Sequence, residues 1–555
     1  MHQTLTDALI LPFFWLLTFV LVSSLGFSFL PFRSHKGVLS GNWFTAFWYG
    51  LALLIVFLQL WNLFYPVNVY AWLCLFPFAA FGFTRLYKAG FHLATFPKPI
   101  VLTLSILIFI FLLLSSLDNT FIYDTHVYHF TYIAWLNKYP VVPGIGNLFI
   151  YLGNNQSYFL YPAFLNGLWS YNKGACAANG LLVVAICIET VLLNAKVLLG
   201  KDKFSFHSAY QLLFLPLCIN AGVTNLSSPT PDIFVNVFTF KIISDLIACI
   251  EAKEITFQDI FLLSFYCLFG VVMKFSFIGV ALGVMTIVCY LLIKNKLWSL
   301  KLIVSTVPFY IVLFVPLIIR GIVASGYLLF PFPQLSVPVD WKVPKQNVID
   351  FNEYVIGFAR THLHGPAANA AAHNYAWVPA WCKRMVNTVQ IIMPSISLIS
   401  IAIYMRLKRI SMQKLNLVLI PISVALVFWL VTAPDIRFSV FILWTLGLAP
   451  AAYFIINMQA RWQRLVPAFV FICSVAIMAK NWNTQLAPLG DIKQESTSVF
   501  VTKSGLKVNI VKDTPGNDIF TLSGCPIPCT FHYPDSSLML RRDNIKDGFK
   551  IVVKN

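Results

Sequence analysis

Long runs of apolar residues recur along almost the whole chain, separated by shorter polar stretches. Each run approaches the roughly 20 residues that an α-helix needs to cross the hydrocarbon core of a bilayer. The pattern predicts about fourteen membrane spans, at 8–30, 44–64, 69–85, 99–117, 176–199, 208–226, 231–250, 257–272, 275–293, 300–319, 386–405, 414–432, 438–457 and 464–481. The predicted fold is therefore an all-α polytopic membrane protein.

Composition agrees with this prediction and excludes an ordinary soluble enzyme. Of the 555 residues, 59% are hydrophobic and only 11% are charged. A soluble domain carries roughly a quarter charged residues. The mean hydropathy is +0.77.

The net charge of +18 would suggest a nucleic-acid partner in a soluble protein, so the position of the basic residues matters. Lys and Arg gather in alternate loops, for example 85–98, 196–203 and 406–414. The short loops 65–68 and 227–231 contain neither. The positive-inside rule places the basic loops in the cytoplasm. We therefore expect no nucleic-acid partner, and we expect a bacterial inner-membrane protein with both termini in the periplasm.

Polar sequence is concentrated on the predicted outer side, in loops 118–175 and 320–385 and in the tail. The chain is thus predicted to form a transmembrane domain, 1–481, followed by a small β-rich outer domain, 482–555. In the tail, an apolar and polar alternation around Ser504-Gly505 predicts a hairpin. The spacing of Cys525 and Cys529 permits a disulfide without requiring one. Interfacial amphipathic helices are predicted in the two loops, at 125–137 and 347–360.

Acidic residues are few on the outer side, so each one is informative. Asp118 and Asp124 follow a predicted span at the membrane surface, where a partly desolvated carboxylate can act as a general base. Asp124 could instead cap the helix that follows it. Asp232 opens a later span, where it could project over the same outer cavity and bind substrate, or only cap its helix.

Two histidines lie close to these acids. His126 and His129 are three residues apart in the predicted helix and can face the same way. This spacing suits a metal pair or contacts with substrate, and equally side chains that bond to headgroups or backbone. His362, His364 and His373 could complete a metal site. A divalent metal ion therefore stays an open alternative as the cofactor, and the pattern of histidines does not identify which metal it would be.

Three basic residues stand at the outer ends of spans, where basic residues are otherwise scarce. They are Lys274, Arg320 and Arg437. Arg binds phosphate through paired, charge-assisted hydrogen bonds, and lipid phosphates lie at this depth. We expect at least one of the three to contact a phosphate; residues that only snorkel to the interface have the same pattern.

These features resemble the GT-C superfamily of membrane glycosyltransferases, which includes the protein O-mannosyltransferases and the aminoarabinose transferases of lipid A. The resemblance rests on Asp118 and Asp124 before the helix at 125–137, the long second outer loop, and the stretch Ala433-Pro-Asp-Ile-Arg-Phe438. It implies a polyprenyl-phosphate-linked sugar donor, and a glycan, lipid or protein acceptor. The family's acids are often closer together than these two, so which one is the base stays open.

The residues favour direct displacement at the anomeric carbon with inversion, because one carboxylate base is present without an obvious second nucleophile. Two alternatives stay open. An O-antigen polymerase or ligase type uses lipid-pyrophosphate donors together with outer-loop Arg and His, here Arg360, His362 and His364. A lipid-linked sugar flippase or transporter would instead need access from both faces, which the short inner loops do not favour.

Overall fold

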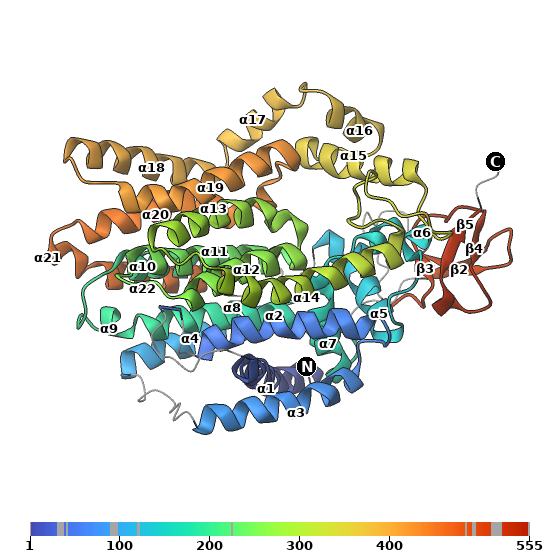
Figure 1. The fold of residues 1–555 in the computed structure, drawn as a ribbon, viewed down its shortest axis with the longest axis horizontal. Helices are drawn as coiled ribbons and strands as arrows, with labels where there is room; N and C mark the ends of the chain where they lie inside the picture. Colours follow the sequence, from blue (N-terminus) through green and yellow to red (C-terminus); the bar gives the residue numbers. More distant parts are fainter. Residues whose placement is uncertain are drawn as a thin grey trace.

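A computed structural model describes residues 2–29, 38–39, 43–88, 98–118, 122–221, 223, 226–482, 486–490, 496–511 and 524–552. Most of the long helices run along the long axis of the molecule, and the C-terminal strands lie at one end of it (Figure 1).

The helices come in two groups along the chain, before and after the second outer loop begins. The first group is α1 (His2–Phe29), α2 (Trp43–Asn62), α3 (Val69–Lys88), α4 (Pro99–Ser116), η1 (Thr125–His129), α5 (Phe130–Lys138), α6 (Ile145–Leu148), η2 (Ile150–Gly153), η3 (Ser157–Phe159), α7 (Leu160–Leu168), α8 (Lys173–Leu193), α9 (Ala195–Leu198), α10 (Phe206–Ala221), α11 (Pro231–Glu251), α12 (Phe257–Met273), η4 (Phe275–Phe277), α13 (Ile278–Lys294) and α14 (Leu300–Ser325). The second group is α15 (Lys345–Thr361), α16 (Pro366–His373), α17 (Val378–Val386), α18 (Val389–Leu407), α19 (Gln413–Thr432), η5 (Ile436–Phe438), α20 (Val440–Ile456), α21 (Ala460–Gln463), α22 (Val466–Lys480) and, between strands of the tail, η6 (Ile545–Asp547).

The predicted spans all fall on helices. Within the described residues, ten helices are long and apolar enough to cross a membrane. Shorter apolar helices occur at Val69–Arg85, Phe257–Met273 and Val440–Ile456. The protein is therefore an integral, multi-pass, mainly helical membrane protein. The total of fourteen spans stays a prediction, because α10 and these shorter helices fall below the usual spanning length.

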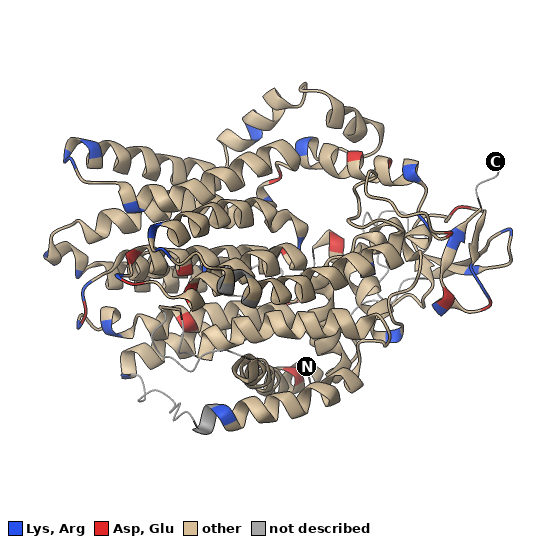
Figure 2. Ribbon diagram, viewed as in Figure 1, with Lys and Arg blue, Asp and Glu red and all other residues tan. Residues whose placement is uncertain are grey.

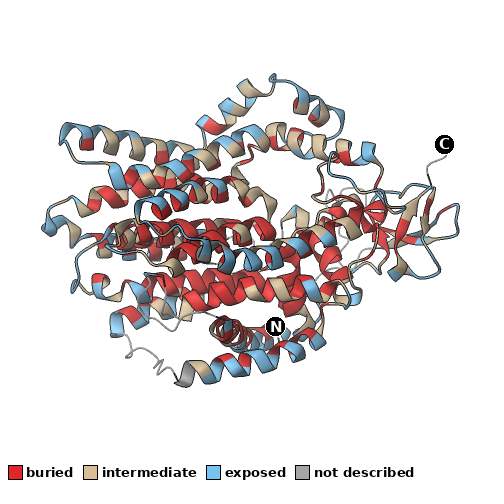
Figure 3. Cartoon of the chain, in the orientation of Figure 1, coloured by how far each residue is buried: buried red, intermediate tan, exposed pale blue. Residues whose placement is uncertain are grey.

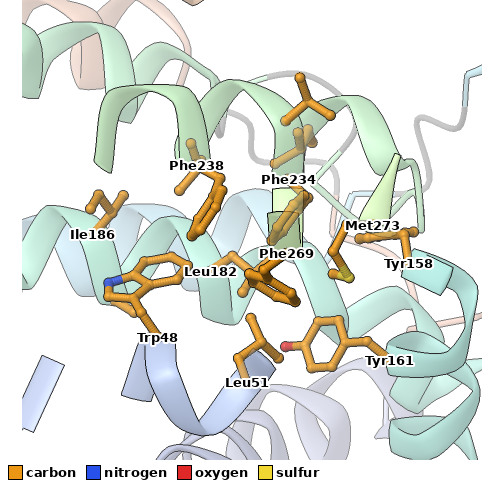
Figure 4. Close-up of a cluster of buried hydrophobic side chains, with 14 of the residues drawn as sticks. Trp48, Leu51, Tyr158, Tyr161, Leu182, Ile186, Phe234, Phe238, Phe269 and Met273 are labelled. Atoms are coloured by element: carbon orange, nitrogen blue, oxygen red, sulfur yellow. The ribbon is translucent and has the colours of Figure 1, made fainter. Parts of the chain in front are cut away.

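The helices pack around a buried core, whose residues are red in Figure 3, and Figure 4 shows a cluster of its aromatic and aliphatic side chains. Phe234 and Phe238 of α11 lie against Phe269 of α12, with ring centroids 5.5 and 5.2 Å away. In the same core, Trp48 of α2 donates a 2.8 Å hydrogen bond to Glu189 of α8. Such pairing is needed because an unpartnered polar group costs free energy away from water.

The first outer loop folds back into the body of the molecule. Residues 125–137 are helical as predicted, but the first turn is a π-helix, η1, and the helix is not an exposed interfacial one. Ile133 and Leu136 are 0% and 5% exposed, and the ring of Trp135 lies 6.0 Å from that of Phe549 in the tail. The prediction of a surface helix was wrong because the tail and α7, distant in sequence, cover it.

The C-terminal strands are β1 (Thr497–Val501), β2 (Lys507–Val511), β3 (Cys529–Thr530), β4 (Leu538–Leu540) and β5 (Phe549–Ile551). β1 and β2 form the predicted antiparallel hairpin, β3 joins β2 in parallel, and β4 pairs with β5. Cys525 and Cys529 form a disulfide. The backbone N–H of Phe549 donates to Pro143 O at 2.9 Å, so the strands are fastened to the first outer loop.

Candidate functional site

Charged side chains from four distant segments meet where α11 and α20 begin and α12 ends. These segments contribute Asp124, Asp232, Lys274, and the pair Asp435 and Arg437. We call these five residues the outer ionic cluster. Each lies at or near the end of an apolar helix, where the chain leaves the predicted membrane region.

The contact between Asp124 and Arg437 joins an early and a late segment of the transmembrane part of the chain. Arg437 Nη1 donates to Asp124 Oδ2 at 2.9 Å across 313 residues of sequence. Both side chains are partly exposed, at 25% for Asp124 and 41% for Arg437. Asp124 makes no capping hydrogen bond to the described backbone of η1. Its carboxylate therefore serves the cluster and not the helix end.

The second ion pair joins Asp232 and Lys274. Thr230 caps α11 by accepting from the backbone N–H of Asp232, which leaves the Asp232 carboxylate to bind Lys274. The ammonium of Lys274 and the guanidinium of Arg437 each lie 4.7 Å from the ring centroid of Phe438. A cation over an aromatic face is stabilised by the ring quadrupole, so Phe438 holds both cations near one position.

His129 is buried beside this cluster. Its Nδ1 lies 2.8 Å from the hydroxyl of Thr125, which also contacts the hydroxyl of Ser228. Within the described part of the chain its Nε2 has no hydrogen-bond partner. Burial lowers the pKa of His129 to about 3; the Asp232 carboxylate opposes this shift, and the positive charges of Lys274 and Arg437 add to it. The imidazole is therefore neutral at physiological pH.

The second outer loop also reaches the cluster. Asp435 accepts from the backbone N–H of Arg437 at 3.0 Å, and its Oδ2 lies 3.4 Å from His362 Nε2. The Trp381 indole donates to Pro434 O at 2.7 Å, and the Trp429 indole donates to Asp435 O at 2.8 Å. The turn before η5 is thus held from two sides, which fixes the position of Arg437.

The electrostatic balance of the cluster favours charged Arg437. Burial by itself lowers the pKa of Arg437, but the carboxylates of Asp124, Asp232 and Asp435 raise it above its ordinary value. The three carboxylates exceed the two cations by one charge. A phosphate entering here must therefore displace a carboxylate from a cation.

Other predicted site residues lie in different surroundings. Asp118 follows α4 and is half-buried, and His126 is half-buried in η1. Arg360 donates to the carbonyls of Ala371 and Ala372 at 3.0 and 2.8 Å, so it holds the end of α16.

Arg320 is fully buried in α14 beside the Tyr132 hydroxyl. Among the described residues its Nε and Nη1 have no hydrogen-bond partner. The adjoining cavity measures about 20 Å³, which is room for about one water molecule. A lipid phosphate could reach Arg320 only if the surrounding side chains moved apart.

The predicted histidine set is dispersed. His362 faces Asp435, His364 Nδ1 lies 3.0 Å from the Tyr354 hydroxyl, and His373 pairs with Glu353 at 2.9 Å. In the described ranges, no three His, Cys, Asp or Glu side chains are grouped so that they could hold a metal ion.

Sequence reasoning did not select Thr125, Ser228, Asp435 or Phe438 as site residues. Asp435 and Phe438 flank Arg437 in the stretch 433–438, so their position beside a candidate phosphate ligand could have marked them. Nothing local distinguishes Thr125 or Ser228, because their contact joins segments 103 residues apart.

The fold and this site define a multi-pass membrane protein with an ionic cluster at one end of its helices. The sequence pattern of one family, described as a domain of unknown function (DUF8201), matches residues 9–444. The chain belongs to this family. The matched range contains the whole outer ionic cluster and ends before the C-terminal strands. No curated protein and no solved structure matches the chain.

Proposed function

We propose that the protein is a membrane glycosyltransferase that moves a hexosyl or pentosyl group from a polyprenyl-phosphate donor to an acceptor at the outer face. The observation that carries the proposal is the Asp124–Arg437 ion pair. It joins a carboxylate suited to general-base catalysis to a guanidinium suited to phosphate binding.

The donor phosphate would bind where two cations converge. Arg437 and Lys274 both lie against Phe438, and each is paired with a carboxylate. The donor phosphodiester carries one negative charge, as a carboxylate does, and its two free oxygens can accept paired hydrogen bonds from a guanidinium, so it can compete with Asp124 for Arg437. This exchange would leave the Asp124 carboxylate without its cation just when the donor is in place.

The released carboxylate would then act on the acceptor. Asp124 takes the proton of the acceptor hydroxyl while the acceptor oxygen forms a bond to the anomeric carbon. The bond from that carbon to the phosphate oxygen breaks, and its electron pair stays on the polyprenyl phosphate. Arg437 and Lys274 stabilise the charge of this leaving group. Direct displacement inverts the anomeric configuration, and Asp124 later gives its proton to water.

A second candidate is a transferase of the O-antigen polymerase or ligase type with a lipid-pyrophosphate donor. The 3.4 Å approach of His362 to Asp435 favours it, because it brings the second outer loop to the cluster. A pyrophosphate presents more charge and would use these additional groups. The two candidates differ in the lipid that is released.

The test is an assay of the purified protein with polyprenyl-phosphate and polyprenyl-pyrophosphate sugars, supplied with membrane acceptors. We expect sugar-dependent release of polyprenyl phosphate. Release of polyprenyl pyrophosphate alone would favour the second candidate. Passage of intact lipid-linked sugar across proteoliposomes without any release would contradict both, and would favour a transporter.

A further inference from the structure

A large cavity lies at the other end of the molecule, between the first turns of α4 and α22. Its volume is about 900 Å³. α4 begins at this cavity and ends just before Asp118, so the cavity and the outer ionic cluster lie at opposite ends of the bundle. Apolar side chains form two of its walls, among them Ile100 and Leu104 of α4 and Phe471 and Ile472 of α22.

The mouth of this cavity is basic. Lys201, Lys203 and Arg464 line it, and Asp202 is the one carboxylate among the described residues that do so. The ammonium of Lys98, at the start of α4, lies beside that of Lys201 and lowers the pKa of Lys201. Neighbouring like charges repel each other, so an anion placed between these exposed ammonium groups would be favoured. Figure 2 shows the basic loops of this end at the left of the molecule.

We propose that this cavity binds an anionic glycerophospholipid, with its phosphate at the basic mouth and its acyl chains against α4 and α22. Both halves of the cavity support this ligand. A free phosphate would use the cations and leave the apolar walls uncovered, whereas a zwitterionic lipid brings a cation of its own to a mouth that is already basic. The inference is independent of the proposed transferase activity, because the lipid here is not the sugar donor.

The experiment compares lipid retention in variants purified from membranes and analysed by native mass spectrometry. In the site variant, Lys201→Gln, Lys203→Gln and Arg464→Gln are combined. The matched control combines Arg406→Gln, Lys408→Gln and Lys414→Gln, which remove three charges from another basic loop outside the cavity. We expect the site variant to retain about tenfold less phosphatidylglycerol than the wild type, and the control to retain as much as the wild type.

A second variant tests the apolar half without changing charge. Ala468, an exposed residue of α22, lines the cavity, and Ala468→Trp would fill space that the acyl chains need. We expect this variant also to lose phosphatidylglycerol while its thermal unfolding in phosphatidylcholine stays near that of the wild type. The proposal would be overturned if the wild type retained phosphatidylcholine as well as phosphatidylglycerol, or if the site and control variants lost equal amounts of phosphatidylglycerol. It would also be overturned if inorganic phosphate raised the thermal unfolding midpoint of the wild type as much as phosphatidylglycerol does.

Discussion

At the scale of single residues, the central feature is that the candidate base is already paired. The Asp124 carboxylate accepts from Arg437, so its negative charge is partly compensated. While its Oδ2 accepts from Arg437, this oxygen is not available to the hydroxyl of an acceptor. In the proposed mechanism, donor binding therefore both supplies the substrate and activates the base.

Replacing the base isolates its contribution. Asp124→Asn keeps the shape of the side chain but removes its basicity, so turnover should fall by about 10²-fold or more. Donor binding should be kept or strengthened, because Arg437 remains and no longer has the Asp124 carboxylate as a competitor. Asp118→Asn should reduce turnover less. Turnover and donor affinity measured on the two purified variants check this, and equal losses of folded protein in both would mean that these acids are structural.

His129 makes a separate prediction about pH. Its pKa is about 3 in the folded protein, against about 6.5 for an exposed histidine. Between these values the unfolded chain binds a proton that the folded protein does not. Stability should therefore fall as the pH drops below about 6.5, by up to about 1.4 kcal/mol per pH unit.

The measurement is the thermal unfolding midpoint of purified protein at roughly pH 7 and roughly pH 5. His129→Gln removes the titrating group, so its midpoint should fall less between the two pH values than that of the wild type. The exposed His364→Gln serves as the control and should behave as the wild type does. An unchanged acid sensitivity in His129→Gln would show that other groups cause it.

At the scale of elements, the α15–α16 pair carries the second outer loop to the cluster. α15 lies close to its predicted position, since the amphipathic pattern of 347–360 is local. α16 contains an Ala-rich stretch, 367–372, which favours a helix locally, but its packing against α15 could not be predicted from sequence. Arg360 binds the carbonyls at its end, and Gly357 lets the backbone of Ala368 approach α15 closely.

This close approach can be tested with one methyl group. A Cβ at residue 357 would overlap the carbonyl oxygen of Ala368, so Gly357→Ala should push α16 away from α15. Hydrogen exchange of 366–373 should become faster, and the contact between His362 and Asp435 should weaken. Val355→Ala, on the more exposed face of α15, should leave exchange unchanged. Wild-type exchange rates in Gly357→Ala would contradict the tight packing.

At the scale of the whole molecule, charge is distributed unequally between the two ends. Lys and Arg gather in the loops at the left of the molecule, whereas the C-terminal strands at the right carry both basic and acidic residues (Figure 2). Asp7, near the start of α1, accepts a 2.9 Å hydrogen bond from the backbone N–H of Leu489. The beginning of the chain therefore lies beside the segment that leads to the tail, which supports placing both on the same side of the membrane.

Membrane orientation has a direct test. In sealed cells, an impermeant thiol reagent should label Lys503→Cys in the tail and spare Arg409→Cys in the loop between α18 and α19. Both positions are exposed, so access depends on the side of the membrane alone. Both variants should be made in a protein whose exposed native cysteines have been replaced, so that labelling reports the introduced cysteine alone. The reverse pattern would invert the predicted topology.

The helices could be predicted from sequence because each span is encoded by its own apolar run. The individual members of the cluster could be proposed for a similar reason, since charges are rare at outer span ends. Their pairing could not be predicted. Asp124 meets Arg437 across 313 residues, and Arg320, which has the same local pattern, is enclosed instead. Only the packing of the helices distinguishes a cation that faces the cluster from one that is buried.

The most direct test of the proposed transferase is lipid phosphate release by three purified proteins given a polyprenyl-phosphate sugar and membrane acceptors. These are the wild type, Arg437→Lys, and the control Arg541→Lys, whose arginine pairs with Asp340 away from the cluster. Lysine keeps the charge of Arg437 but cannot form two parallel hydrogen bonds to phosphate. We expect sugar-dependent release of polyprenyl phosphate by the wild type and the control, and markedly less by Arg437→Lys. Equal release by all three would reduce Arg437 to an interfacial anchor, and no release by the wild type would contradict the proposed function.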